Sequence, residues 1–144
     1  GIVGTNTRLG FSGMEVGMVL DAAYALRGIP IACLRVSFAD ERPRHSGLSH
    51  HTATALRLAT RERVYVAVPR LDDPEQSRRL HADLQAATID RRHELVTVDA
   101  PDVLDLFRRH DLEVESMGRA AADDPALFQA AAAAGALAAR RVDA

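Results

Sequence analysis

Short β-branched runs alternate along this chain with amphipathic helical patterns, and this alternation constrains the fold more than any other feature. The clearest strand patterns are Ile29 to Phe38, Arg63 to Val68 and Glu94 to Val98, and each is followed by helical spacing. Parallel strands need such crossovers, and helices then cover both faces of their sheet. The alternation predicts an α/β fold, a Rossmann-like three-layer sandwich with about five mostly parallel strands. Leu112 to Met117 alternates like a half-exposed strand, so the last strand could be an antiparallel edge.

Capping signals set the bounds of the expected helices. Ser12 and Glu15 have capping-box spacing and Gly28 supplies a stop, which predicts a helix over about 13–27. Ser49 is placed to cap a short helix over about 50–60. The later helices are expected to begin at Asp73-Pro74 with Leu80 and Leu84 facing inward, at Asp99 and Pro101, and at Asp124-Pro125 with an alanine face from Ala126 to Ala139.

Length and composition favour one compact domain. The 144 residues suit a single core, and no repeat or linker divides the chain, so residues 1–144 are expected to form a single α/β domain. The chain starts with glycine inside an apolar run, which suggests that it is the C-terminal part of a longer protein. Its single cysteine, Cys33, lies in an apolar run, which predicts a buried thiol and a cytoplasmic location. No apolar stretch is long enough for a membrane span.

Several classes of function have little support in the sequence. All 18 basic residues are arginine, but the net charge of −2 and the 4% aromatic content argue against a nucleic-acid partner. The absence of lysine excludes a P-loop, and the spacing of Gly10, Gly13 and Gly17 differs from the dinucleotide fingerprint. No nucleophile elbow is present, and no motif specifies a cofactor. Whether the protein is an enzyme stays open.

Reactive side chains concentrate in residues 37–52, where three of the six histidines fall within seven positions. In open parallel sheets, ligands bind beyond the carboxyl ends of the strands, so we expect the loops 5–13 and 40–51 to meet there. Arginine forks and helix N-termini both attract anions. The sequence therefore predicts a site for a small phosphate or carboxylate, with these binding residues: Arg8, Ser12, Gly13, Asp40, Arg42, Arg44, Ser49 and Arg119.

The histidines of this segment permit three interpretations. His45, His50 and His51 could be catalytic, because neutral imidazoles near a helix N-terminus can donate to an oxyanion or move a proton. In a metal site, His45 and either His50 or His51 would bind one ion together with Asp40, but neighbouring residues of a helix point about 100° apart and do not easily share an ion, so no metal site is predicted. In the third interpretation the segment is structural: one histidine bonds a backbone carbonyl and the others face water, the serines cap helices, and the arginines pair with Asp40 and Glu41 or are solvated.

A different class of function also fits these residues. The domain could be a non-enzymatic interaction or oligomerisation module that supports an N-terminal region of the same protein, with the histidine-rich loop docked against that region. A bound phosphate near Ser49 would favour the anion site, whereas a large exposed apolar patch beside the loop would favour the module.

Long motifs in the chain resemble a known family. They are Gly4-Thr-x-Thr-Arg-Leu-Gly-Phe-Ser-Gly13, the run from Arg35 to Thr54, Met117-Gly-Arg119 and Asp124-Pro-x-x-Phe128. Together they resemble domain-of-unknown-function family 3866, which is found mainly in actinobacteria. The resemblance covers essentially the whole chain and implies that the intact protein has a further N-terminal region. It implies no activity and no catalytic residues.

Overall fold

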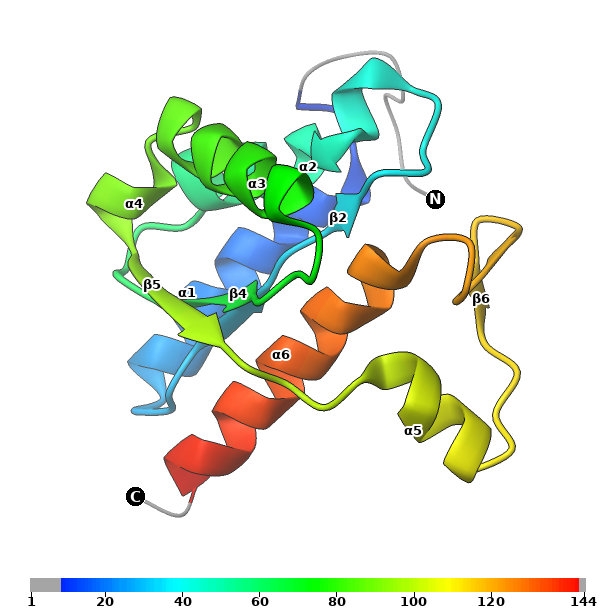
Figure 1. Cartoon of the computed structure of the whole chain (residues 1–144). Helices are drawn as coiled ribbons and strands as arrows, with labels where there is room; N and C mark the ends of the chain where they lie inside the picture. Colours follow the sequence, from blue (N-terminus) through cyan, green and yellow to red (C-terminus); the bar gives the residue numbers. More distant parts are fainter. Residues whose placement is uncertain (1–8, 143–144) are drawn as a thin grey trace.

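Three parallel strands form the central sheet of this domain (Figure 1). The computed structural model describes residues 9–142. Strand β4 (Tyr65–Pro69) lies in the middle, between β1 (Ile31–Cys33) and β5 (Glu94–Val98). Tyr65 is opposite Ile31 on one side and Glu94 on the other. The predicted α/β class with a parallel sheet is confirmed.

A single sheet of five strands is not seen among residues 9–142. The expected edge strand, Leu112 to Met117, supplies only β6 (Glu115–Ser116), which pairs antiparallel with β7 (Arg119–Ala120) in a separate hairpin. Met117 and Gly118 both have positive φ, 56° and 74°, and such a two-residue turn folds the chain back on itself. The prediction that this strand lies at the edge of the main sheet was wrong, because it pairs with the next strand along the chain. A further strand, expected before the loop 5–13, lies outside the described residues.

The long apolar run from Ile29 to Phe38 is also divided. After β1 the chain leaves the main sheet, and β2 (Val36–Ser37) pairs antiparallel with β3 (Gly47–Leu48). Cys33, which was predicted to be buried, is exposed. It ends a strand that pairs on only one side within residues 9–142, and the side chain of the preceding residue, Ala32, faces the core.

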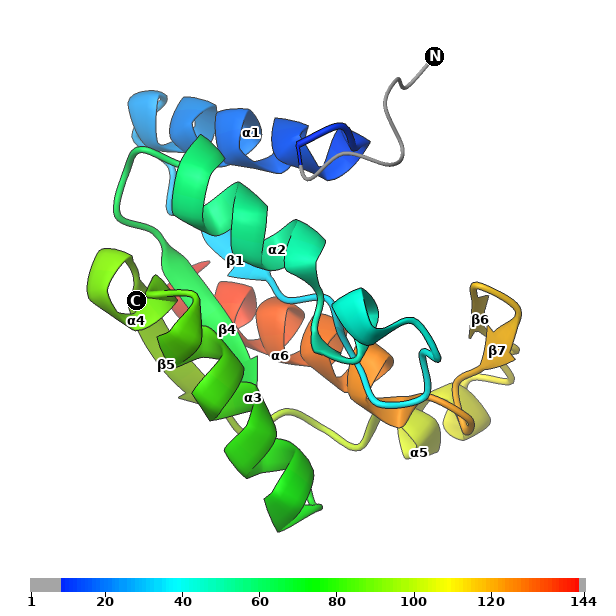
Figure 2. The same ribbon diagram turned by 90° about the horizontal axis from the view of Figure 1, so that it is seen from above.

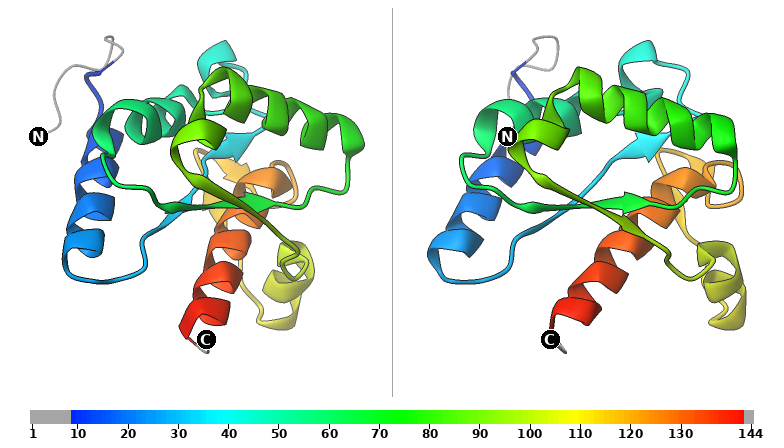
Figure 3. Two further views of the ribbon diagram at one scale, coloured as in Figure 1. Left: turned by 90° about the vertical axis from the view of Figure 1, so that its left-hand side faces the viewer. Right: turned by 60° about the vertical axis from the view of Figure 1, so that its left-hand side comes forward.

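Helices cover both faces of the sheet (Figure 3). Helix α6 (Pro125–Val142) lies along one face, whereas α2 (His50–Thr54), the π-helical turn η3 (Ala55–Ala59) and α3 (Pro74–Ala86) cover the other. Successive side chains of β4 point alternately to the helices on the two faces of the sheet. Val66 and Val68 pack with Leu80 and Leu84 of α3, and Ala67 packs with the alanine face of α6. No helix in the described part is long and apolar enough to cross a membrane.

The helix ends agree with the capping signals in part. Ser49 and Asp73 cap α2 and α3 as predicted, each accepting a hydrogen bond from a backbone N–H two residues later. Helix α5 (Val103–Arg109) instead begins after Asp102, whose carboxylate accepts from two backbone N–H groups, so the prediction of Asp99 as its start was wrong. The chain also forms two short helices that were not predicted, η2 (Pro43–His45) and α4 (Ile89–Arg92).

Helix α1 (Glu15–Ala25) has different ends from those expected. A 3₁₀ turn, η1 (Ser12–Met14), precedes it, and Phe11 occupies the cap position without a side-chain bond, so the capping box at Ser12 does not form. At the other end Arg27 adopts the left-handed conformation, with φ of 62°, and the N–H of Gly28 bonds to the carbonyl of Ala23 at 2.9 Å. This is the Schellman pattern, with arginine in the position that glycine usually takes.

Close packing at Gly17 fixes α1 against η3, and the two helices lie side by side in Figure 2. A Cβ atom on Gly17 would lie 2.5 Å from the carbonyl carbon of Ala59 and 2.6 Å from its Cβ. Backbone atoms cannot rotate out of the way as a side chain can. Gly17 is therefore required by the approach of the two helices.

We expect Gly17→Ala to lower the free energy of unfolding by about 1–3 kcal/mol, because the methyl group forces the two helices apart. Gly135→Ala is the matched control, since a Cβ there meets no atom within 4 Å and alanine is the better helix former. Urea denaturation of both variants measures the difference. An unchanged or raised stability for Gly17→Ala would contradict the packing at this contact.

Candidate functional site

A buried carboxylate organises the loop that the sequence singled out. The side chain of Asp40 is only 2% exposed, and the Nε and Nη2 atoms of Arg42 donate to its two oxygens at 2.9 and 2.8 Å. Arg35 and Arg119 each place an Nη2 atom 3.5 Å from Oδ2. The hydrogen bond from the Arg42 side chain is the main reason that the pKa of Asp40 lies well below its usual range.

A second carboxylate extends this network to α6. The hydroxyl of Ser37 donates to Asp124 at 2.6 Å, and Nε of Arg119 donates to the same oxygen at 3.2 Å. The Ser37 hydroxyl oxygen also accepts from the backbone N–H of Asp40 at 3.1 Å. The network therefore joins β2, the loop after it, β7 and the start of α6. Three of the predicted ligand-binding residues, Asp40, Arg42 and Arg119, bind one another within it.

His45 is attached to the same network through Arg35. Its ring is buried, with 2% of the residue exposed, and Nδ1 lies 2.9 Å from Nη1 of Arg35 and 2.8 Å from the hydroxyl of Ser49. Because a guanidinium can only donate, we assign Nδ1 as the acceptor and place the proton of the neutral ring on Nε2. Burial and then the charges of Arg35 and Arg42 lower the pKa of His45 to about 4. The ring is neutral at physiological pH.

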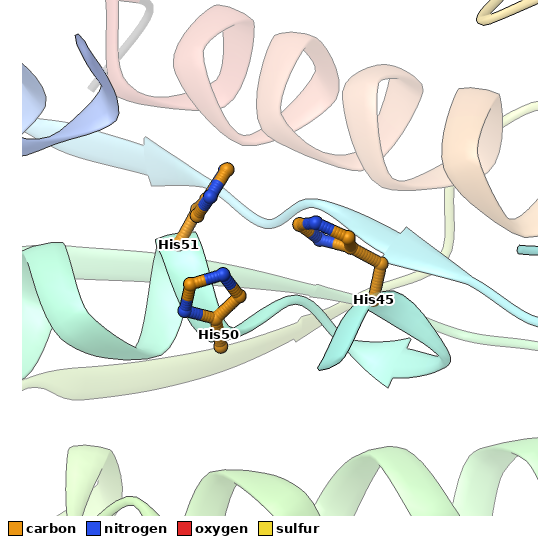
Figure 4. A group of neighbouring side chains, drawn as sticks. All are labelled: His45, His50 and His51. Atoms are coloured by element: carbon orange, nitrogen blue, oxygen red, sulfur yellow. The ribbon is translucent and has the colours of Figure 1, made fainter. Parts of the chain in front are cut away.

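Three histidine rings converge beside this network (Figure 4). His45 comes from η2, and His50 and His51 open α2. One ring nitrogen of each lies within 4.8 Å of the other two, and we call these three residues the histidine cluster. Phe11 stacks on the ring of His51 with a centroid distance of 4.0 Å and an angle of 11°. Burial, followed by the charge of His50, lowers the pKa of His51.

The position of Phe11 tests part of the prediction that the loops 5–13 and 40–51 meet. The described part of the first loop does reach the second, because Phe11 contacts both His50 and His51. Arg8 lies outside the described residues. Ser12 is exposed in the 3₁₀ turn, and a Cβ on Gly13 would lie 2.8 Å from the Phe11 ring.

Ser49 has a structural position in this arrangement. It is fully buried, and its hydroxyl accepts the N–H of His51 at 3.3 Å while it contacts His45. It therefore both caps α2 and orients the ring of His45.

A pocket of about 340 Å³ opens next to the histidine cluster. It is lined by Arg44, His50, Ala53, Thr54, Arg57 and Ala87. The lining residues include two arginines, a histidine and a threonine, and no acidic residue. We call this hollow the arginine pocket. A larger pocket of about 920 Å³, between α5 and the β6–β7 hairpin, includes none of the three histidines.

Arg57 was not among the predicted site residues. His50, Ala53, Thr54 and Arg57 are spaced i, i+3, i+4 and i+7, which is the spacing of one helix face. That periodicity was the signal in the sequence that could have assigned Arg57 to the site.

We expect Asp40→Asn to lower the free energy of unfolding by about 1–3 kcal/mol, because the amide carries no charge and its NH₂ group opposes the arginine donors. Asp105→Asn is the control, since Asp105 forms exposed ion pairs on α5 that contribute at most about 0.5 kcal/mol. Chemical denaturation compares the two. Equal, small losses for both variants would show that the Asp40 network does not hold the loop.

Comparisons with known proteins give one match. A family model described as "Protein of unknown function (DUF3866)" matches residues 1–135. No curated protein and no solved structure matches the chain.

Proposed function

The chain therefore belongs to this family of proteins of unknown function, and we propose that its domain binds a small anion, a phosphate or a carboxylate, in the arginine pocket. The observation that carries the proposal is the lining of the pocket. Arg44, Arg57, His50 and Thr54 all line one hollow, and no acidic residue lines it. Forked guanidinium donors match the oxygens of phosphates and carboxylates.

The arginines around the histidine cluster form two groups, those that pair with carboxylates and those that do not. Arg35, Arg42 and Arg119 face the carboxylates of Asp40 and Asp124. Arg44 and Arg57 form no ion pair within residues 9–142, and both are exposed. Their positive charge is therefore not neutralised by the protein itself. A small anion would supply the missing partner.

The other predictions of the sequence are consistent with this role. A Rossmann-like arrangement would bring the polar loops to the carboxyl edge of the sheet, where anions commonly bind. Cys33 is a free and exposed thiol, which suits the reducing cytoplasm.

We expect phosphate or a small carboxylate to raise the melting temperature of the wild type, and Arg44→Gln and Arg57→Gln to abolish that increase. Without ligand, both variants should stay within about 0.5 kcal/mol of the wild type, since exposed positions away from structural contacts tolerate substitution. Arg91→Gln, at an exposed position of α4, is the control. A thermal-shift titration measures each. The site would be contradicted if anions did not raise the melting temperature of the wild type, or if Arg91→Gln lost that increase to the same extent.

A second candidate function is favoured by the outer face of α1. This helix exposes large apolar side chains, including Met18 at 68%, Val19 at 66% and, just after its end, Leu26 at 84%. Contiguous exposed apolar surface marks protein contacts more often than open solvent. The domain could therefore pack through α1 against a second copy of itself or an N-terminal region of the same protein.

For this candidate we expect the wild type to self-associate and the variant Met18→Glu with Val19→Glu to be monomeric, because the charges cannot be buried in an apolar contact. Ala131→Glu, at an exposed position on α6, should leave the association unchanged. Sedimentation velocity over a range of concentrations measures this. A wild type that stays monomeric throughout would remove self-association as the role of α1.

A further inference from the structure

We propose that the histidine cluster binds a divalent transition-metal ion of the Zn²⁺ kind. One nitrogen of each of His45, His50 and His51 lies within 4.8 Å of the other two. Zinc–imidazole bonds of about 2.0–2.1 Å in a tetrahedral site place ligand nitrogens about 3.4 Å apart. The nitrogens therefore need to approach one another by no more than about 1.4 Å, and rotation of the side chains has to turn their lone pairs toward the ion. This proposal does not depend on the anion site.

Helix geometry predicts that His50 and His51 point about 100° apart, but their rings nevertheless lie close together. His50 and His51 leave the helix in different directions, yet their ring centroids lie only 4.3 Å apart, and they lie 5.2 and 4.7 Å from the ring centroid of His45 (Figure 4). His45 approaches from another element, η2. The three histidines therefore approach one another from two elements, η2 and α2. Side-chain rotation, and not only backbone direction, decides where the nitrogens lie.

Contacts around the rings already restrict their orientation. Phe11 stacks on His51, and Ser49 and Arg35 hold Nδ1 of His45. Partners of this kind orient histidine ligands in metal sites. When Nε2 of His45 binds a metal, Nδ1 carries the proton and donates to Ser49 at the observed 2.8 Å, and Arg35 then turns toward Asp40.

The ligand set selects the class of ion. The cluster offers three imidazoles and no carboxylate, and nitrogen ligands favour zinc, cobalt, nickel and copper over magnesium and calcium. Three protein ligands leave a fourth position open, as in catalytic zinc sites.

The charges that face the cluster decide what fills the fourth position. Arg35, Arg42 and Arg44 act on the histidines, and Asp40 is the carboxylate that opposes them. The positive charge that remains opposes binding of a cation, so an anionic fourth ligand that offsets it, such as hydroxide or a small oxyanion, is favoured. His50 also lines the arginine pocket, so a bound ion would face that pocket.

The test is a titration of the metal-free protein with Co²⁺, followed by competition of Zn²⁺ against a chromophoric chelator. We expect one ion per chain, with the visible absorption of tetrahedral Co²⁺. His50→Gln and His51→Gln should each weaken binding by about tenfold or more, since one of three ligands is lost. His110→Gln, at an exposed position after α5, is the matched control and should bind as the wild type does.

Circular dichroism of the metal-free variants shows whether each is folded, and either folded variant is enough to decide. Absent Co²⁺ absorption in the wild type, unchanged affinity in a folded cluster variant, or an equal loss in His110→Gln would overturn the proposal. Arg44→Gln and Arg57→Gln should keep the metal, so failure of the anion site and failure of the metal site give different results.

Discussion

The buried carboxylate of Asp40 holds the irregular part of this domain in place. Between β1 and α2 the regular elements are only two or three residues long, so backbone hydrogen bonds fix little of that segment. The forked contact with Arg42 and the bonds through Ser37 supply the missing constraints. Arg35 lies between Asp40 and His45, and the position of the histidine cluster therefore depends on the same carboxylate.

The arginines near the histidine cluster lie in two different environments. Arg35, just before β2, Arg42 in the following loop and Arg119 of β7 neutralise buried carboxylates, and removing those carboxylates would leave charges in a poorly solvated place. Arg44 and Arg57 lie outside that network on the solvent side of α2 and η3. Neighbouring arginines of one loop thus differ, because Arg42 pairs with a buried carboxylate while Arg44 is exposed to solvent.

Hydrophobic periodicity and caps predicted the regular elements well. β4, β5, α3 and α6 lie where the sequence places them, because each buries a continuous apolar face. The strand count was not predictable, since alternation shows that residues 112–117 are half exposed but not which strand they pair with. Residue types drew attention to the loop that carries the histidine cluster. They could not distinguish Arg42, which pairs with Asp40, from Arg44, which forms no ion pair within residues 9–142, because both arginines lie within four residues of that carboxylate.

The π-helical turn η3 limits how the length of this domain can vary. A π turn holds one more residue than an α turn, and Thr60 bonds back to the carbonyl of Ala55 across it. The turn also ends the helix, because Thr60 has an extended backbone and the chain then runs on to β4. The hydroxyl of Thr60 donates to the same carbonyl of Ala55 at 3.1 Å, so the turn is closed by two hydrogen bonds. A deletion within 55–59 would shift the point at which the chain leaves the helical layer for β4. Natural relatives are therefore expected to accept substitutions in this turn far more readily than changes in its length.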